Sequence, residues 1–549
     1  MPLIEVSKTD LQNLIGKKLP NDLEELDAII SYAKGEVESL DGDVLKLNLE
    51  DSNRPDLWST EGLARHFRSF FNINCDKPKV ESSDYKVFVT DSMRHIRPFI
   101  ACVVAKDVKL NDATIKQLMQ TQEKIDATYG RNRSKTSIGL YKFDKLKWPL
   151  KYTLTSPDEH AFVPLGFNEK MTPKDILSEH PKGQMYGEIL KGFDKYPLFI
   201  DSDNKVLSMP PIINSSDLGQ IDSDTTNILI EVTGTDHKTV NNVLEILALI
   251  MTERNGKLYS VAIDYTYRTL ERTPAFATKD AKLKVSDANE LLGIKLSTKD
   301  IVALLNKMGY DAQFVSDKDV AIKIPSHRLD IMHPVDVIED IAIAYGYNKF
   351  TRKQLDLPVS GGLSDDDMLM DKVRELCIGL GGQEILNFNL TDKESLFLKT
   401  NLPEEDVIEI ENPVVQTNSV LRHTLISSIL EFLSKNTSQE FPQKVFEVGD
   451  ITLFKPGEET GIKGEKRVCF AISHSNANFT EIKQHLDNLF SNLGWDLKVN
   501  EIEHQSFVTG RCANIITPEG ENGVIGEIHP QVLNNWGIEQ PTVVFEIKL

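Results

Sequence analysis

Four carboxylates lie close together near the middle of the chain, at Asp330, Asp336, Glu339 and Asp340. On a helix beginning near Pro334, the last three stand at i, i+3 and i+4 and therefore share one face. A turn just upstream would fold Asp330 back toward the same face. Three or four hard oxygen ligands at this spacing suit Mg²⁺, which takes a few carboxylates and retains waters. The alternative is a solvated acidic face at a helix N-terminus, which the helix dipole favours.

The elements that must position these carboxylates can be predicted from hydrophobic periodicity. Residues 320–325 alternate as a short strand, and this strand leads directly into the acidic loop and helix. Ile338 and Ile341 fall on the opposite face of that helix and are expected to bury it. Upstream, Ser297 and Asp300 have the spacing of a capping box, which predicts the start of another helix.

The segment from Arg328 to Tyr347 reads R-x-D-I-x-x-x-x-D-V-I-E-D-I-A-x-x-Y-G-Y. It resembles the magnesium-binding segment of the phenylalanyl-tRNA synthetase beta subunit, in the form found in archaea and eukaryotes. All four acidic positions of that segment are filled here, with Asp340 where Glu is more usual. The resemblance implies that the four carboxylates bind Mg²⁺ close to a partner alpha subunit, and it extends over essentially the whole chain.

Length and resemblance together indicate an α+β multidomain protein, because 549 residues exceed what one hydrophobic core supports. The resemblance implies an N-terminal α/β domain at 1–90 and an editing domain, which deacylates tRNA, at 91–268. It further implies a winged-helix-like metal-binding module at 269–352. The last domain, at 360–549, is expected to be a degenerate class II synthetase-like antiparallel sheet domain without ATP motifs.

A single carboxylate within an apolar strand is the second candidate for chemistry. Residues 226–233 read as a strand that carries Glu231, and such a carboxylate is costly unless it has a partner or a function. Upstream, Asn214 and Ser215 are turn formers with backbone N–H groups to offer. The segment resembles an editing domain that hydrolyses tyrosine mistakenly attached to phenylalanine tRNA. Glu231 is then expected to accept the tyrosine hydroxyl, and the turn to hold the developing oxyanion; the alternative is a simple ion pair at Glu231.

A basic island interrupts an otherwise acidic chain at Arg131, Arg133 and Lys135, with aromatic residues interleaved. Cations hold phosphates and aromatic rings stack on bases, so this island is predicted to bind tRNA; the alternative is a solvated loop. The formal net charge of −21 means that a nucleic acid must be met by local patches or by another subunit. Nearby, Asp126 and Lys142 stand where relatives commonly carry His and Asp.

The C-terminal sequence lacks the residues that handle ATP in a class II synthetase. Arg422 is available, but no second arginine clamp follows, and no G-x-x-x-x-G-K-[ST] loop occurs. Adenylyl and phosphoryl transfer depend on positioned positive charge. This domain is therefore expected to be a structural paralogue that packs on a catalytic alpha subunit, where ATP would bind.

The resemblance implies a beta chain in an alpha2beta2 heterotetramer that attaches phenylalanine to its tRNA and hydrolyses mischarged tyrosyl-tRNA. The cofactors would be ATP and Mg²⁺. Two rivals stay open: a non-enzymatic scaffold with a decayed editing site, and a free-standing aminoacyl-tRNA deacylase. Five scattered cysteines without a C-x-x-C pair indicate reduced thiols in a cytoplasmic protein. No apolar run reaches the roughly 18 residues of a membrane span, and no signal peptide begins the chain.

Overall fold

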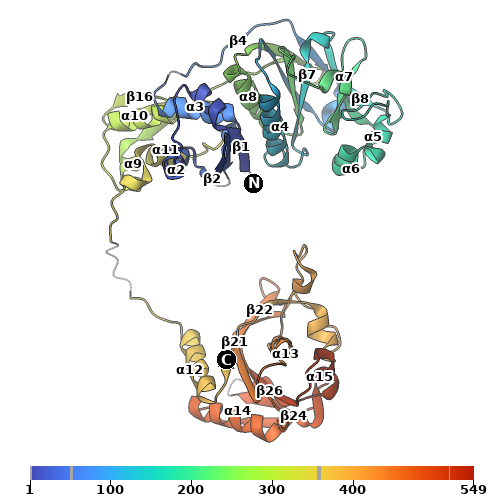
Figure 1. Ribbon diagram of the computed structural model, residues 1–549, viewed down its shortest axis with the longest axis vertical. Helices are drawn as coiled ribbons and strands as arrows, with labels where there is room; N and C mark the ends of the chain where they lie inside the picture. Colours follow the sequence, from blue (N-terminus) through green and yellow to red (C-terminus); the bar gives the residue numbers. More distant parts are fainter. Residues whose placement is uncertain (1–2, 50–52, 74, 355–359, 518–519) are drawn as a thin grey trace. The chain divides into compact units, whose positions relative to one another are not determined.

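The structure divides into two compact units between Lys353 and Gln354, each with its own sheets and cores (Figure 1). The expected α+β multidomain architecture is confirmed, since helices and strands alternate throughout both units. All five cysteines are free thiols. Within the described residues no helix is long and apolar enough to cross a membrane. The computed structural model describes residues 3–49, 53–73, 75–354, 360–517 and 520–549.

The N-terminal part of the first unit is a three-stranded sheet of order β1-β3-β2 packed against helices. The alternation of Leu45 and Leu47 with polar residues predicts the central strand, and both leucines are fully buried. Ser59 caps α3 by accepting the Gly62 N–H at 3.0 Å, as its sequence position predicts. The elements are β1 (Leu3–Ser7), α1 (Lys8–Ile15), α2 (Leu23–Ile30), β2 (Glu36–Asp41), β3 (Val44–Asn48) and α3 (Thr60–Phe70).

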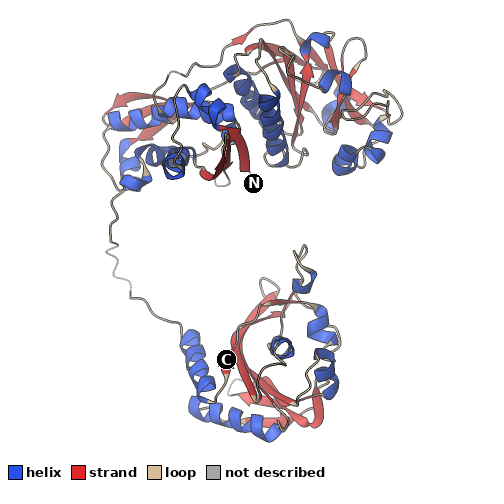
Figure 2. Cartoon of the chain, viewed as in Figure 1, coloured by secondary structure: helices blue, strands red, loops and turns tan. Residues whose placement is uncertain are grey.

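The middle of the first unit is built on an eleven-stranded sheet (Figures 1 and 2). Its main path runs β11-β10-β9-β8-β5-β13-β6-β12-β7, and β4 and β14 also pair with β13. Residues 76–86, which read as a linker, contain the short strand β4. The strands are β4 (Val80–Glu81), β5 (Lys86–Val89), β6 (Phe99–Lys106), β7 (Thr136–Lys142), β8 (Leu150–Thr155), β9 (Tyr196–Ile200), β10 (Val206–Met209), β11 (Ile213–Asn214), β12 (Ile228–Gly234), β13 (Lys257–Tyr265) and β14 (Glu271–Thr273).

Two long helices cover one face of this sheet: α4 (Asp112–Ala127) and α8 (His237–Glu253). Strand β12 is buried on both faces, which explains its continuous apolar sequence. Ile230 and Val232 point into the core beneath α8, whereas Leu229 belongs to the core on the other face. Because side chains alternate along a strand, Glu231 lies on that other face. The shorter helices are α5 (Pro173–Glu179), α6 (Pro181–Tyr186) and α7 (Ser216–Gly219).

A second three-stranded sheet, of order β15-β17-β16, closes the first unit. The predicted capping box is present, because Ser297 and Asp300 exchange side chain to backbone hydrogen bonds at the start of α10. The strand before the acidic loop and the helix beginning at Pro334 are likewise confirmed. The elements are β15 (Lys279–Lys284), α9 (Val285–Leu292), α10 (Thr298–Lys307), β16 (Asp311–Ser316), β17 (Asp319–Ile324) and α11 (Pro334–Tyr345).

The second unit is a seven-stranded sheet of order β18-β21-β22-β26-β25-β24-β23 with helices on both faces (Figure 2). All neighbouring strands are antiparallel except the pair β18 and β21. Ser364 caps the first helix, as its sequence predicts. The elements are α12 (Asp365–Gly379), β18 (Gln383–Glu384), β19 (Leu390–Thr391), β20 (Val420–Leu421), α13 (Ile426–Lys435), β21 (Gln443–Phe454), β22 (Ile462–Ser473), α14 (Phe479–Leu493), β23 (Lys498–Glu501), β24 (Phe507–Thr517), β25 (Gly520–Ile528), α15 (Pro530–Trp536) and β26 (Thr542–Lys548).

The faces of this sheet carry separate cores, one beneath α12 and α14 and the other beneath α13 and α15. The sequence of residues 383–390 predicts one strand, but only Gln383–Glu384 and Leu390 belong to strands, in β18 and β19. Its apolar residues Leu386 and Phe388 are 89% and 83% exposed, so they have no half-buried sheet surface to pack on.

Candidate functional site

A cavity of about 620 Å³ lies at the β7 edge of the large sheet. It brings together residues that the sequence predicted as a site, Asn214 and Glu231, although they lie on different strands. Ser215 does not line it. Polar residues around the cavity come from α4, β7, α6, β10, β11, α7, β12 and the loops between them: Gln122, Glu123, Arg133, Ser137, Asn168, Lys182, Ser208, Asn214, Ser216, Gln220 and Glu231.

Glu231 is the buried acidic residue of this cavity, with a side chain only 2% exposed, whereas the exposed Glu123 of α4 also lines it. The Tyr141 hydroxyl donates to Glu231 Oε2 at 2.7 Å and lies 2.8 Å from Ser208 Oγ. Glu231 Oε1 accepts no hydrogen bond from any described residue. Burial raises the pKa of Glu231 to about 7 and that of Tyr141 well above its ordinary value. The tyrosine therefore stays a donor, and Glu231 keeps one buried acceptor to spare.

The simple ion pair considered for Glu231 does not form, because no Lys, Arg or His of the described chain lies within ion-pair distance of its carboxylate. Its position depends instead on the register of the sheet, where Gly139 of β7 lies directly opposite Glu231. Tyr141 and Ser208 were not singled out from the sequence. Only the pairing of β7 with β12 brings the phenol to the carboxylate, across 90 residues of sequence.

The turn at Asn214 and Ser215 differs from expectation. The Ser215 and Ser216 N–H groups donate to the carbonyl oxygens of Leu207 and Val163, each at 2.8 Å. These N–H groups are therefore not free to hold an oxyanion, because the turn is itself a part of the sheet. The Asn214 side chain lines the cavity, whereas the buried Ser215 hydroxyl has no partner among the described residues.

Arg133 belongs to the cavity wall and not to an outer basic surface. Its Nη1 donates to the carbonyl oxygens of Pro211 and Ile212 at 3.3 and 3.0 Å, and its guanidinium lies 4.4 Å from the centre of the Tyr186 ring. Asp126 Oδ2 lies 3.2 Å from Arg133 Nε, and burial raises the pKa of Asp126 to about 7. These contacts of the Arg133 guanidinium fix the position of the loop at the rim of the cavity.

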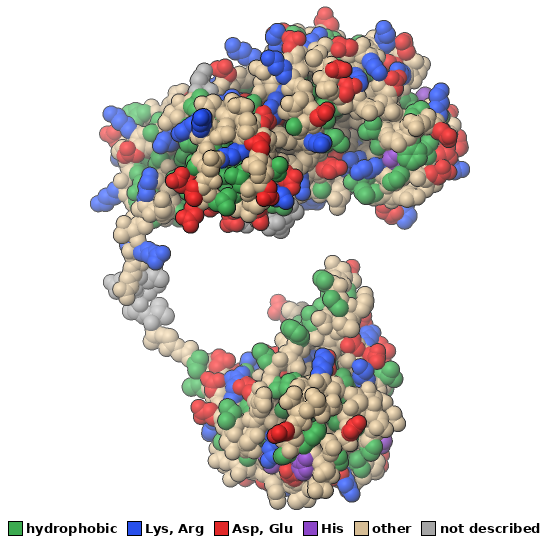
Figure 3. Space-filling model, in the orientation of Figure 1, with side chains coloured by type: hydrophobic (Ala, Val, Ile, Leu, Met, Phe, Trp, Pro, Cys, Tyr) green, Lys and Arg blue, Asp and Glu red, His purple; other side chains and the backbone are tan. Residues whose placement is uncertain are grey.

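The remaining basic island also separates in the structure. Lys142 pairs with Asp222, and Lys145 lies 3.2 Å from Asp217, so both cations are neutralised locally. Arg131 is exposed and Lys135 is half-buried. On the visible face of the first unit in Figure 3, acidic and basic side chains are interspersed. The cations of this stretch therefore do not form one continuous surface for RNA.

The acidic cluster near α11 is organised around an arginine. Arg328 donates to both oxygens of Asp330, at 3.0 and 2.7 Å, and its Nη2 also pairs with Asp340. The Tyr310 hydroxyl donates to Asp340, which is fully buried, so the alternative of a solvated acidic face does not hold for this residue. Burial alone would raise the pKa of Asp330, but Arg328 outweighs it and lowers that pKa to about 2.

The other two carboxylates have separate structural tasks. Asp336 accepts the Met332 and His333 N–H groups at 2.8 and 2.6 Å and so caps α11. Glu339 lies 2.9 Å from Lys34 Nζ. Among the described residues, no three His, Cys, Asp or Glu side chains are placed to hold a metal ion. The four carboxylates as arranged do not fit the predicted Mg²⁺ site, because a guanidinium takes the place of the cation.

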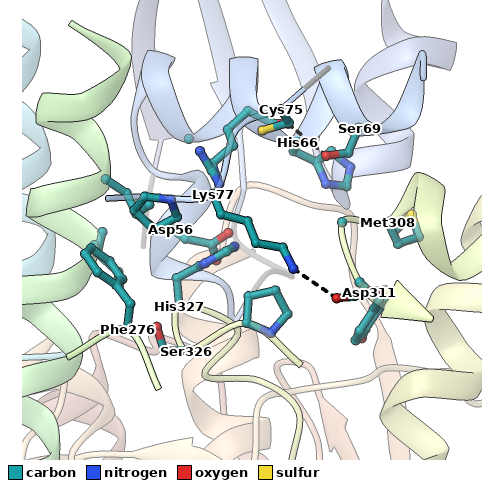
Figure 4. A pocket seen from close by; sticks show the side chains of 18 of the residues that line it. Asp56, His66, Ser69, Cys75, Lys77, Phe276, Met308, Asp311, Ser326 and His327 are labelled. Carbon is teal, nitrogen blue, oxygen red and sulfur yellow. Dashed lines mark hydrogen bonds and ion pairs between the residues drawn. The ribbon is translucent and has the colours of Figure 1, made fainter. Parts of the chain in front are cut away.

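A second cavity, of about 520 Å³, lies where two sequence motifs meet (Figure 4). Asp56 comes from the N-R-P-D-L segment and His327 from the segment before the acidic helix. The N-R-P-D-L sequence of residues 53–57 predicts a turn with an Arg–Asp pair, and the pair is present, because Arg54 Nη2 lies 2.7 Å from Asp56 Oδ2. Lys77 pairs with Asp311 at 3.0 Å, and burial lowers the pKa of His327 to about 4. The charges here are mostly paired, as at a structural junction.

Two arginines of the second unit, Arg422 and Arg467, are held by buried carboxylates. Arg422 Nη1 lies 2.7 Å from Glu447 Oε1, and both side chains are almost fully buried. Arg467 Nη1 lies 3.0 Å from Glu546, which also accepts the Leu425 N–H. Neither guanidinium is free to bind a phosphate, in agreement with the absence of ATP motifs from the sequence.

Two family descriptions match parts of the chain. Residues 281–347 match the tRNA synthetase B5 domain, and residues 355–549 match the phenylalanyl tRNA synthetase beta chain CLM domain. The first range spans β15 to α11, with Arg328 and its carboxylates, and the second covers the seven-stranded sheet.

Relatives of known identity match over the full length. The phenylalanine–tRNA ligase beta subunits of Thermococcus sibiricus and Pyrococcus furiosus are each 41% identical, covering all of this chain and 98% and 99% of the relative. A solved N-terminal fragment of the Pyrococcus horikoshii phenylalanyl-tRNA synthetase beta subunit is 38% identical with a TM-score of 0.60. It covers 63% of this chain and all of that one. The chain accordingly belongs to the phenylalanine–tRNA ligase beta subunit family.

Proposed function

We propose that this chain acts as the beta subunit of a phenylalanine–tRNA ligase, which with an alpha subunit joins phenylalanine to its tRNA. The full-length relationship to beta subunits supports this assignment. Adenylation is assigned to the alpha chain, together with ATP and its Mg²⁺, because Arg422 and Arg467 are committed to buried carboxylates. The proposed assembly is an alpha2beta2 tetramer in the cytoplasm, where tRNA is charged.

The domain plan follows the same proposal. The first unit comprises the N-terminal α/β domain at 1–90, the editing domain at 91–268 and the winged-helix-like module at 269–352. The second, at 360–549, is the class II synthetase-like domain without ATP motifs. Each of the three sheets in the first unit falls within one proposed domain, apart from three strands of the large sheet: β4 and β5 lie before residue 91, and β14 lies after residue 268.

Exposed apolar side chains of the second unit support an alpha partner. Leu386, Phe388, Leu398 and Val414 are among its most exposed apolar residues. All lie on loops or short turns outside the seven-stranded sheet. Apolar residues left exposed together mark protein interfaces, whose centres are depleted of charge. They are assigned to the contact with the alpha subunit.

Proofreading is the second activity proposed for the chain, and the unpaired Oε1 of buried Glu231 is the observation that carries it. Tyrosine differs from phenylalanine by one hydroxyl, and a pocket built for phenylalanine rejects that addition incompletely. A second site restores accuracy when it demands the hydroxyl, because its buried polar group stays unpaired with phenylalanine. Glu231 Oε1 would accept that hydroxyl inside the 620 Å³ cavity.

The chain's own residues suggest how the ester would be held. Tyr141 fixes the Glu231 carboxylate by its hydrogen bond to Oε2, which leaves Oε1 directed to the substrate. The Asn214 amide lines the same cavity and is assigned to bind near the ester, in place of the occupied turn N–H groups. Water is the nucleophile, and the hydrolysis releases tyrosine and free tRNA.

The test is to co-express this chain with an alpha subunit and to measure phenylalanine charging and the hydrolysis of preformed tyrosyl- and phenylalanyl-tRNA. We expect that the complex, and neither chain by itself, charges tRNA with phenylalanine. We also expect the complex to hydrolyse tyrosyl-tRNA faster than phenylalanyl-tRNA. Glu231→Ala should spare charging and slow tyrosyl-tRNA hydrolysis by roughly tenfold or more, as for a lost hydrogen bond to a charged group. Glu188→Gln, at an exposed ion pair in the same domain, is the matched control.

Each rival function has its own outcome in these assays. Charging without any tyrosyl-tRNA hydrolysis would favour the scaffold with a decayed site. Hydrolysis by the chain without an alpha subunit, and no charging with one, would favour a free-standing deacylase. Unchanged hydrolysis by Glu231→Ala would remove this residue from the mechanism while leaving the ligase assignment in place.

A further inference from the structure

One loop separates two cavities of the first unit. Arg133 lines the cavity of Glu231, whereas Tyr129, four residues earlier, lines a groove of about 470 Å³. Three successive residues of this loop, Arg131, Asn132 and Arg133, have left-handed backbone angles, with φ of 49°, 50° and 66°. Such a run is unfavourable for residues with side chains, so the surrounding contacts must hold it. The hydrogen bonds from Arg133 to the carbonyl oxygens of Pro211 and Ile212 hold the loop in this conformation. The loop is therefore a fixed wall between the Glu231 cavity and the groove.

The groove presents cations that have no partner among the described residues. Lys238, in the first turn of α8, and Lys279, at the start of β15, both line it and are exposed. Other lysines of this acidic chain lie beside carboxylates, as Lys142, Lys145 and Lys257 do. Uncompensated lysines at one groove of a protein with a net charge of −21 therefore indicate a polyanionic ligand.

The charged groups facing these lysines inside the groove are already engaged. The buried Glu245 accepts the Phe276 N–H at 2.8 Å, and Arg328 is held by its two aspartates. The other lining residues near the lysines are neutral, among them Asn242, Ala277 and Ser326. A hydrogen bond from an N–H leaves the charge of the Glu245 carboxylate in place, so Glu245 offsets one of the two lysines and the walls leave the other uncompensated.

An aromatic ring stands beside these lysines. The Asn242 side chain donates to the Tyr129 hydroxyl at 3.2 Å and so fixes the orientation of the half-buried ring. A fixed aromatic face next to lysines is the arrangement with which proteins bind single-stranded nucleic acid, by stacking on bases and by contacting phosphates. The loop continues this surface, since the Thr235 N–H donates to the Lys135 carbonyl at 3.1 Å and holds the loop against the start of α8.

We propose that the groove of Tyr129, Lys238 and Lys279 binds the single-stranded 3′ end of tRNA, which Arg131 and Lys135 then lead across the loop to the Glu231 cavity. In this arrangement the lysines contact phosphates and Tyr129 stacks on a base. The inference rests on the proposed proofreading function and supplies the RNA contacts for it. It also narrows the prediction made for Arg131, Arg133 and Lys135, of which Arg131 and Lys135 make no ion pair with a described residue.

The experiment uses the full complex with its alpha subunit and compares Lys238→Ala/Lys279→Ala with the parent. The expected result is a roughly tenfold higher KM for tyrosyl-tRNA hydrolysis with unchanged kcat and unchanged phenylalanine charging. Each phosphate contact to a single strand contributes about 0.7 to the slope of log affinity against log salt. The double variant should therefore lose about 1.4 from that slope. Tyrosyl-adenosine, which has no phosphates, should be hydrolysed equally by both proteins.

The matched control is Lys195→Ala/Lys318→Ala, which removes two exposed lysines that line neither cavity. Tyr129→Leu should raise KM without changing the salt slope, because it removes stacking and not charge. A double variant that behaves as this control in both KM and salt slope overturns the groove assignment. So does equal binding of an acidic peptide in place of RNA.

The outcome remains separable if proofreading itself is absent. A parent complex that hydrolyses neither tyrosyl-tRNA nor tyrosyl-adenosine overturns the proposed function. Binding of a labelled single-stranded oligonucleotide with the sequence of the tRNA 3′ end then tests the groove by itself. Loss of about 1.4 from its salt slope in Lys238→Ala/Lys279→Ala supports the groove, and an unchanged slope rejects it.

Discussion

Gly139 lies directly opposite Glu231 where β7 pairs with β12, and the missing side chain of one makes room for the carboxylate of the other. A Cβ at position 139 would stand 2.4 Å from Glu231 Oε2 and 2.2 Å from the Tyr141 hydroxyl oxygen. Both distances are well inside van der Waals contact. The acidic corner of the cavity is therefore set by a glycine whose role is purely spatial.

Gly139→Ala should displace Glu231 and Tyr141 and destabilise the first unit by about 1–3 kcal/mol, the usual cost of overpacking. Tyrosyl-tRNA hydrolysis should fall by roughly tenfold, as for a lost hydrogen bond. Calorimetry and a deacylation assay measure the two effects. Gly464→Ala is the control, because Gly464 also lies in a strand and a Cβ there meets no atom within 4 Å. A Gly139→Ala variant with parental hydrolysis would show that the corner is not used.

The stability of the first unit should fall as pH rises through the titration of Glu231. Its pKa is raised by burial from 4.5 to about 7, so protonation stabilises the fold fully below pH 4.5, and this stabilisation is lost as pH rises toward 7. At about 1.4 kcal/mol for each pKa unit, the loss is roughly 3 kcal/mol. Asp126, with its pKa raised to about 7, acts in the same direction.

Glu231→Gln isolates the contribution of this one group, because glutamine does not titrate. Calorimetry at pH 5 and pH 7 compares the melting temperatures of the variant and the parent. The melting temperature of the variant should rise relative to that of the parent as pH increases. Glu188→Gln, at an exposed ion pair, should keep a constant difference from the parent. A constant difference for Glu231→Gln as well would mean that Glu231 titrates near its ordinary pKa.

Arg328 should be essential to the module around α11, whereas Mg²⁺ should not. Arg328→Met leaves Asp330 and Asp340 buried without their partner, and breaking such a pair costs about 3–5 kcal/mol. Lys191→Met, at an exposed pair with Glu188, should leave the melting temperature close to that of the parent. Thermal unfolding measures both.

The metal half of this prediction has its own test. Titration of the isolated chain with MgCl₂, against an EDTA reference, should leave its melting temperature unchanged, because the carboxylates already have a guanidinium, a backbone cap and a lysine as partners. A saturable rise that Asp336→Asn/Glu339→Gln abolishes would instead establish the magnesium site expected from sequence.

The chain alone should not form an aminoacyl-adenylate. Its buried Arg422 is paired with Glu447, so this guanidinium is not available to bind a phosphate. ATP–pyrophosphate exchange with phenylalanine should appear only after an alpha subunit is added, and a soluble Arg422→Lys complex should keep it. Exchange by the purified single chain would contradict the assignment of ATP to the alpha subunit.

Local signals account for what the sequence predicted correctly. Ser59, Ser297 and Ser364 cap helices as their positions indicate, because a cap is decided within four residues. Glu231 was found for a similar reason, since a carboxylate in an apolar strand is anomalous without knowledge of any neighbour. These features need no tertiary information.

What the sequence did not predict depends on contacts between distant segments. Tyr141 meets Glu231 only through strand register, and Lys238 joins Lys279 only because α8 lies near β15. Helical spacing placed Asp340 on an acidic face, but spacing carries no information on whether that face is buried. The pairing of Asp340 with Arg328, twelve residues upstream, decided its burial.

Arg328 also gives the first unit a cation that cannot diffuse away. A bound metal ion is lost when its free concentration falls, and each binding event carries an entropic cost of association. A guanidinium attached to the backbone has no such equilibrium with the solvent, and it stays charged at every physiological pH. The module around α11 is therefore expected to fold equally well in cells with low and with normal concentrations of divalent ions. A shortage of these ions would then lower the supply of metal-bound substrates and leave the folding of this protein unchanged.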